Sequence, residues 1–363
     1  MNAPVTRLWP AGSATGVGSL PGTDPGEAIR LILGELPDLP HLPELPERGA
    51  GADMIGRGAV LLPGLPVEIQ PSGWRLTSAP GAELRRARDF LDRDLDALQE
   101  HADGHHGAIK VQVVGPWTLA ASIELPSGNR VLSDHGATRD LAESLVEGVR
   151  AHVAELVRRL PNSRLVVQVD EPSLPAALAA RIPTPSGWGT LRSVDVQLAE
   201  SRLRDLLAVL PLGGRVVHCC ADEPPLRLLL AAGADALSVD LRRLSTADFD
   251  VLGEAVDDGV SLWLGVLPGK DPVGWVDPGR DGESGHGSDG GRREDRGRSG
   301  QSISLEAAQD PIMRFWSALG FPAAQLADTV VPTPSCGLAG SSAGYLRRVL
   351  SVLRDAGRSF AES

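Results

Sequence analysis

The residues best suited to chemistry stand in the segment RVVHCCADEP, at positions 215–224. His218 and Cys220 lie two residues apart at the end of an apolar run that predicts a buried strand. Because side chains at i and i+2 of a strand point the same way, an imidazole and a thiolate can converge there on one ion. Cys336 follows another apolar run, in VVPTPSCGLAG. These three side chains form a ligand set that suits catalytic zinc with an exchangeable fourth position.

A second interpretation of the same residues needs no metal. The chain has three cysteines, two of them adjacent, which cannot make a disulfide framework. Cys219, Cys220 and Cys336 could therefore be buried thiols, with His218 a hydrogen-bonded core residue. Their position after predicted strands favours the metal site.

Carboxylates end two further predicted strands. LVVQVDEPSL leads to Asp170 and Glu171, and DALSVDL leads to Asp240. A carboxylate at the C-terminal end of a barrel strand is well placed to bind a metal or a substrate amine. An Asp before a helix also caps the free N–H groups of the first turn, so both roles stay open.

Two glycine-containing turns could contribute to a binding site. TGVGSLPGTD, at 15–24, offers backbone N–H groups after a predicted strand and could cradle a carboxylate, but it lacks the G-x-G-x-x-G of dinucleotide sites. In KVQVVGPWTLA, Gly115 and Pro116 end a strand. Trp117 could line the site of a flat substrate, although a place in the core is favoured.

The elements that position these residues alternate between short apolar runs and helix-period stretches, the rhythm of βα units. Eight strands alternating with helices predict a single (β/α)8 TIM barrel of the α/β class over residues 1–363. An open doubly wound sheet is the alternative, because the second run is weak. The eight runs are 14–18, 52–55, 109–114, 165–169, 215–218, 236–240, 261–266 and 329–332.

Two segments interrupt this pattern. Residues 278–301 are Gly, Arg, Asp and Ser with almost nothing apolar, which predicts a disordered insertion after the seventh strand. Residues 37–51 are rich in proline but carry Leu at regular spacing, which predicts an ordered loop that could cap the site.

The composition narrows the class of protein. The formal net charge of -12 argues against a nucleic-acid surface, which needs clustered Lys and Arg. The N-terminus lacks the apolar region of a signal peptide, and no stretch reaches the roughly 18 apolar residues of a membrane span. We therefore expect a cytoplasmic protein without a nucleic-acid or membrane partner.

An ordered series of short motifs resembles the catalytic barrel of cobalamin-independent methionine synthase, within the superfamily that includes uroporphyrinogen decarboxylase. The series covers nearly the whole chain, and its strength lies in its order, since no single motif is specific. The motifs are VGSLP at 17–21, GPWTL at 115–119, QVDEPSL at 168–174, HCC at 218–220, SVDL at 238–241, LGVLPGKDP at 264–272 and SCGL at 335–338.

The resemblance implies a Zn²⁺ cofactor held by His218, Cys220, Cys336 and Asp240, with Asp replacing the family's Glu. It also implies a homocysteine site. The family's backbone contacts fall on Val17, Gly18 and Ser19, and its acidic contacts fall on Asp170 with Glu44 or Glu47 as second partner. The implied activity is methyl transfer to the thiol of homocysteine, giving methionine.

The chain departs from the family pattern in three places. It has a single barrel where full-length members have two. The family's Asp and His after the seventh strand are replaced by Pro268, Gly269 and Lys270, so Lys270 becomes the catalytic candidate there. Ser122 stands near the place of the folate-stacking Trp, and Trp117 is a candidate substitute.

These departures leave the methyl donor open between 5-methyltetrahydrofolate and a methylcorrinoid protein. They also leave three rival functions. The first is a corrinoid-dependent methyltransferase for another thiol. The second is a uroporphyrinogen decarboxylase-like enzyme, which would leave the Cys and His set unexplained. The third is an inactive barrel that acts as a binding module.

Overall fold

The computed structural model describes residues 7–273, 275 and 303–362. Its strands are β1 (Val67–Gln70), β2 (Gly73–Leu76), β3 (Ala108–Val114), β4 (Arg164–Asp170), β5 (Arg215–Cys219), β6 (Ala236–Asp240), β7 (Ser261–Leu267) and β8 (Val330–Pro334). Its α-helices are α1 (Pro25–Glu35), α2 (Met54–Val60), α3 (Ala82–His101), α4 (Pro116–Ser122), α5 (His135–Arg159), α6 (Leu174–Leu178), α7 (Val196–Leu207), α8 (Leu226–Ala231), α9 (Thr246–Asp257), α10 (Leu305–Leu319), α11 (Leu326–Thr329) and α12 (Ala343–Ala361). Short 3-10 helices are η1 (Pro46–Arg48), η2 (Val131–Ser133), η3 (Leu241–Arg243) and η4 (Ala323–Gln325).

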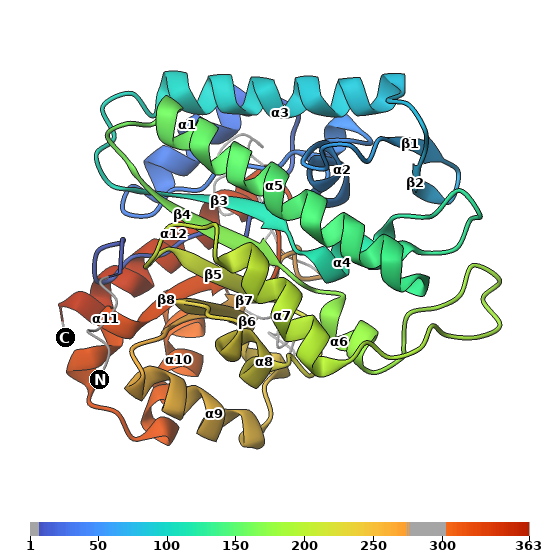
Figure 1. Ribbon diagram of the computed structural model, residues 1–363. Helices are drawn as coiled ribbons and strands as arrows, with labels where there is room; N and C mark the ends of the chain where they lie inside the picture. Colours follow the sequence, from blue (N-terminus) through green and yellow to red (C-terminus); the bar gives the residue numbers. More distant parts are fainter. Residues whose placement is uncertain (1–6, 274, 276–302, 363) are drawn as a thin grey trace, which may run out of the picture.

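Strands β3 to β8 form one parallel sheet in which each strand pairs with the next along the chain. Helices lie outside this sheet and connect its strands (Figure 1). Six of the eight predicted strands are thereby confirmed. The prediction missed the antiparallel hairpin β1–β2, which stands apart from the main sheet.

The first predicted strand is present as an extended segment without a regular ladder. The amide of Thr15 donates to the carbonyl of Pro332 in β8 at 3.4 Å, and Ser19 forms a parallel bridge with Glu44. This segment therefore adds to the sheet beside β8, as the barrel prediction requires.

The second predicted strand, at 52–55, is wrong, because Met54–Val60 forms α2. Its place is taken by the Pro-rich segment 40–44, where His41 forms a parallel bridge with Lys110 of β3. Pro40 and Pro43 have no N–H to donate, so this segment cannot make a continuous ladder. The pairing still runs from β8 through both irregular segments to β3, which closes a TIM-barrel-like ring.

Inward-facing side chains change character along the barrel axis. At the start of the strands they are apolar and form a buried cluster with Trp9 and Leu39, and the six that the strands supply are Ala108, Val166, Val216, Ala236, Trp263 and Val331. Two residues further on, the positions of the same parity are Lys110, Gln168, His218, Ser238, Gly265 and Thr333. Because alternate residues share one face of a strand, the barrel is apolar at its base and polar toward its C-terminal end.

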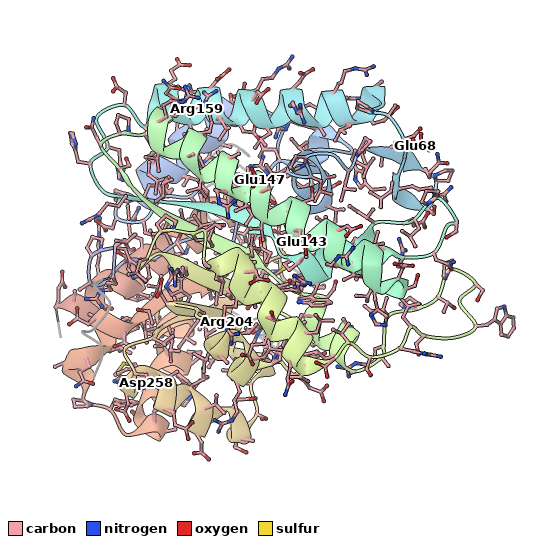
Figure 2. The ribbon with its side chains drawn as sticks, in the orientation of Figure 1. Glu68, Glu143, Glu147, Arg159, Arg204 and Asp258 are labelled. Carbon is pink, nitrogen blue, oxygen red and sulfur yellow. The ribbon has the colours of Figure 1, made fainter. Side chains whose placement is uncertain are left out.

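The other parity of each strand packs beneath the helices, and Cys219 belongs to this apolar layer. Many charged side chains lie on the outer faces of the helices. Glu143 and Glu147, for example, lie on the outward face of α5 (Figure 2), where their side chains are 60% and 66% exposed. None of the helices that the structure describes is long and apolar enough to cross a membrane. The predicted insertion at 278–301 lies outside the described residues.

Candidate functional site

The sequence-predicted thiols meet at the C-terminal end of the barrel. Cys220 directly follows β5 and Cys336 follows β8, and their sulfur atoms lie 3.6 Å apart. The neighbouring Cys220 thiol first and the His218 ring second lower the pKa of Cys336 to about 4, against the effect of burial. The pKa of Cys220 is raised, mainly because its thiol donates to Cys336. The pair therefore loses its first proton from Cys336.

His218 is oriented for a ligand by its neighbour on β6. Its Nδ1 lies 2.8 Å from the hydroxyl of Ser238, and the ring is 3% exposed. Its Nε2 is buried and has no hydrogen-bond partner. A hydrogen bond at one ring nitrogen that leaves the other free is the usual arrangement of a metal-binding histidine.

The fit of these residues to zinc can be tested on the sulfur separation. Tetrahedral zinc with Zn–S bonds of about 2.3 Å places two thiolate sulfurs about 3.8 Å apart. The observed 3.6 Å between Cys220 and Cys336 is close to that value, and the free Nε2 of His218 supplies a third donor. Within residues 7–273, 275 and 303–362, however, no group of three or more His, Cys, Asp and Glu side chains stands ready to hold a metal ion. The donor set fits zinc in kind and in sulfur spacing.

Asp240, the expected fourth ligand, lies at the end of β6 and is 4% exposed. Its Oδ1 accepts from the amide of Arg242 at 3.0 Å and from Nε at 3.1 Å, and its Oδ2 accepts from Nη2 at 3.1 Å. Nε of Arg243 lies 3.5 Å from the same Oδ2. As it stands, the carboxylate is bound to arginine at both oxygens.

A second group of polar residues surrounds Asp170, which is buried at the end of β4. Its Oδ1 accepts from Nε2 of Gln168 at 2.6 Å, and it forms no ion pair with any residue in the described part of the chain. Burial raises the pKa of Asp170, while His218 and Lys110 oppose the shift. A buried carboxylate without a counter-ion is costly, so the site favours a cationic ligand.

Lys110 organises this group from inside the barrel, and its side chain is fully buried. Its Nζ donates to the carbonyl of Val17 at 2.7 Å, to Oε1 of Gln168 at 2.8 Å and to Oε1 of Gln112 at 3.2 Å. Burial lowers its pKa to about 7, while Asp170 and Glu44 oppose the shift. The sequence analysis missed all three of these residues. The signal was a Lys and two Gln at alternate positions of otherwise apolar strands.

The predicted backbone cradle at Val17, Gly18 and Ser19 is built into this network. Gln168 also donates to the carbonyl of Val17, at 3.0 Å. The carbonyl of Ser19 accepts from the amide of Leu338 at 2.7 Å, two residues after Cys336. The first segment therefore lies directly against the loop that carries the last cysteine.

The structure separates the two glutamates that the resemblance left as alternatives. Glu44 is 6% exposed and lies on the segment that pairs with Ser19, whereas Glu47 is exposed on η1. Nε of Arg57 lies 3.6 Å from Oε1 of Glu44, and the Arg57 guanidinium is bound in turn by buried Asp94. Burial raises the pKa of Glu44 to about 7, with Arg57 opposing.

The structure places Trp117 in the barrel wall and Lys270 in the loop after β7. Trp117 is 1% exposed, and its ring nitrogen donates to the carbonyl of Ala199 in α7 at 3.0 Å, so its ring is part of the barrel wall. It also lines a cavity of about 680 Å³ formed by residues of α5, α7 and the chain just before each. Lys270 follows β7 and lies against Gly340, where an added Cβ would stand 3.1 Å from its Cε.

Glu171 serves the fold. Its carboxylate accepts from the amides of Trp117 and Thr118 at 2.9 and 2.8 Å and from the Thr118 hydroxyl at 2.7 Å. These are the first free N–H groups of α4, whose N-cap Gly115 has no side chain to bind them. Glu171 therefore caps a helix from the neighbouring strand.

This cap predicts that Gly115→Ala destabilises the protein. An added Cβ would lie 2.2 Å from Oε1 of Glu171, which must then leave its buried donors. We expect a loss of about 3 kcal/mol, measured as a lower urea midpoint at unchanged slope. The matched control is Gly34→Ala on exposed α1, where an added Cβ meets nothing within 4 Å. Gly34→Ala should be neutral or slightly stabilising. Equal midpoints for both variants would contradict the capping role.

The fold and the site together define a TIM-barrel-like α/β protein with its polar residues at the C-terminal end of the strands, the usual place for an active site. No protein-family model and no curated protein sequence matches the chain. Among solved structures, it is similar to a B12-independent methionine synthase from a Shewanella species, determined in complex with selenomethionine. The TM-score is 0.54 at 12% sequence identity, and the match covers 97% of this chain and 98% of that one. At this identity the likeness shows a shared fold.

Proposed function

We propose that this protein is a zinc-dependent methyltransferase that moves a methyl group to the thiol of homocysteine and forms methionine. One observation carries the proposal: two different sets of polar groups lie at the same end of one barrel. The first is the His218, Cys220 and Cys336 set, and the second is the Asp170 and Glu44 pair beside the backbone of residues 17–19. A thiol amino acid is the kind of molecule that needs both.

Different residues would bind the metal, the substrate ammonium and the substrate carboxylate. His218, Cys220 and Cys336 would hold the metal, which when bound would lower the pKa of the substrate thiol so that sulfur attacks as a thiolate. Asp170 and Glu44 would bind the substrate ammonium, and the backbone N–H groups of 17–19 would bind its carboxylate. The thiol gives up its proton, a sulfur–carbon bond forms, and the bond between the methyl group and its donor breaks.

The fold of the similar structure supports the choice of substrate. That protein is a B12-independent methionine synthase bound to selenomethionine, an amino acid with the same carbon skeleton as the product proposed here. The cytoplasm, with its reduced thiols and small metabolites, would be the matching compartment.

Two methyl donors fit this chemistry, and the residues near the family's folate position bear on the choice between them. Ser122 stands near the place of the folate-stacking tryptophan, and its hydroxyl donates to the carbonyl of Thr118 at 2.7 Å. Trp117 points its ring toward α7. Neither Ser122 nor Trp117 therefore offers a ring for a folate to stack on, which supports a methylcorrinoid as the rival to 5-methyltetrahydrofolate. With 5-methyltetrahydrofolate as donor, Lys270 would supply the proton to the leaving nitrogen.

The proposal predicts methionine formation from homocysteine with one of the two donors. Reduced, zinc-loaded protein is incubated with homocysteine and either 5-methyltetrahydrofolate or methylcobalamin, and methionine is measured by mass spectrometry. We also expect 2-mercaptoethanesulfonate, a thiol without an ammonium group, to be a poor acceptor. Equal rates with both thiols would contradict the amine site. No zinc in protein purified without chelator, and no product with either donor, would contradict the function as a whole.

A further inference from the structure

The position of Asp240 suggests a role different from the one that the sequence resemblance implies. We infer that Asp240 is not a metal ligand, and that it acts through Arg242 to position the loop carrying Cys336. Arg242 is therefore a positioning residue of the metal site, an inference that rests on the proposed function. The inference rests on a contact between the chain just after β6 and the chain just after β8.

The first step concerns the carboxylate itself. Asp240 is 4% exposed, and Arg242 binds it with the backbone amide, Nε and Nη2 at 3.0 to 3.1 Å. The two-point contact between guanidinium and carboxylate is among the stronger hydrogen-bonded ion pairs in proteins. To bind a metal, Asp240 would have to break this contact and leave an arginine charge beside a divalent cation.

The second step follows Arg242 to the other strand. Its Nη2 also donates to the hydroxyl of Ser335 at 3.0 Å, and Ser335 directly precedes Cys336. Ser335 is 3% exposed, and its amide donates to the carbonyl of Leu267 at 2.8 Å. Arg242 therefore fixes the chain on one side of Cys336, while the Ser19 to Leu338 hydrogen bond fixes it on the other.

The third step is the charge of the metal site. Two thiolates and a neutral imidazole balance the charge of Zn²⁺ without a further anion. The Asp240–Arg242 pair is neutral as a unit and leaves the fourth position free. A substrate thiolate can then bind there without displacing a protein carboxylate.

The inference is tested by titrating Co²⁺ into the reduced, metal-free full-length protein and following the thiolate-to-cobalt absorption band. Arg242→Gln and Asp240→Asn should each weaken binding by about tenfold to a hundredfold, the usual effect of residues that orient ligands. Both variants should keep the band of the wild-type protein, because the ligands are unchanged. The double variant should be no weaker than either single variant, since both break the same bridge.

Two further variants keep the test informative if these proteins fold poorly. Ser335→Ala removes only the second half of the bridge and leaves Asp240 paired, so a smaller loss in the same direction is expected. Arg227→Gln is the matched control, because Arg227 on α8 is 70% exposed and pairs with surface residue Glu254. It should bind Co²⁺ like the wild type.

The opposite changes in Co²⁺ affinity would overturn the inference. If Asp240 were a ligand held back by arginine, Arg242→Gln would bind Co²⁺ as tightly as the wild type or more tightly, and Asp240→Asn would alter the absorption band. A wild-type protein that binds no Co²⁺ would contradict the proposed function and this inference together. Binding in the wild type with a tighter Arg242→Gln variant would contradict the inference alone.

Discussion

Replacing Cys336 with alanine is expected to abolish tight zinc binding and methyl transfer. The sulfur lies 3.6 Å from that of Cys220, so its removal leaves His218 and one thiol, which is too few donors for a stable zinc site. Loss of a residue that merely orients a ligand costs about tenfold to a hundredfold in metal affinity. Loss of the ligand itself should therefore exceed about a hundredfold. Zinc content by elemental analysis and methionine formation should fall together.

The adjacent cysteine provides the control for this prediction. Cys219 is 1% exposed and faces the helices, and burial raises its pKa to about 12. Cys219→Ala should lower stability by about 1 kcal/mol through the lost packing, while zinc content stays at the wild-type level. Equal zinc loss from Cys219→Ala and Cys336→Ala would contradict the assignment of Cys220 and Cys336 as the metal pair. Full zinc content in Cys336→Ala would contradict it directly.

The sequence predicted the regular part of the barrel well because its strands are mostly apolar runs buried on both faces. Strands such as β3 and β4 contain no proline or glycine, so the pattern alone locates them. The two irregular segments were harder. Pro40 and Pro43 remove backbone donors from 40–44, so this part of the ring has no strand signature and depends on β3 and the 14–20 segment for its position.

In the candidate site, too, some features could be predicted from the sequence and others could not. His218 lies in β5 and Cys220 directly follows this strand, so the two-residue period predicts that their side chains point the same way. The contacts of Asp240 could not be predicted, because they depend on Arg242 turning back in η3 and on the register between β6 and the end of β8. The choice between Glu44 and Glu47 likewise depended on which side of a Pro-rich turn faces the barrel.

The buried network around Lys110 shows what the apolar pattern conceals. In the strand AIKVQVV the Lys and Gln interrupt an otherwise apolar run, and the barrel interior places both beside the carbonyls of residues 17 and 42. Their hydrogen bonds hold the first two segments, which lack regular ladders of their own. The polar interior therefore supports both the fold and the binding groups.

Replacing Asp170 with asparagine is expected to raise the KM for homocysteine by about thirtyfold to a thousandfold with zinc content unchanged. Asp170 is buried and fixed by Gln168 at 2.6 Å, yet it has no ion-pair partner in the part of the chain that the structure describes. A substrate ammonium would supply that charge. Losing such a charged hydrogen bond costs about 2 to 4 kcal/mol, which gives the expected range. The measurement is the KM for homocysteine beside elemental zinc.

The pH dependence of binding separates the second carboxylate from the first. Burial raises the pKa of Glu44 to about 7, so this group gains its negative charge only as the pH rises through that value. Homocysteine keeps its ammonium in this range and should bind more tightly from pH 6 to pH 8. Glu44→Gln should remove this rise, whereas Glu47→Gln, on exposed η1, should keep it. If the rise persisted in Glu44→Gln and vanished in Glu47→Gln, the exposed glutamate would be the amine partner. An unchanged KM in Asp170→Asn would mean that the buried carboxylates have only a structural role in the barrel. A charge that binds the substrate cannot be removed without an effect on the affinity for that substrate.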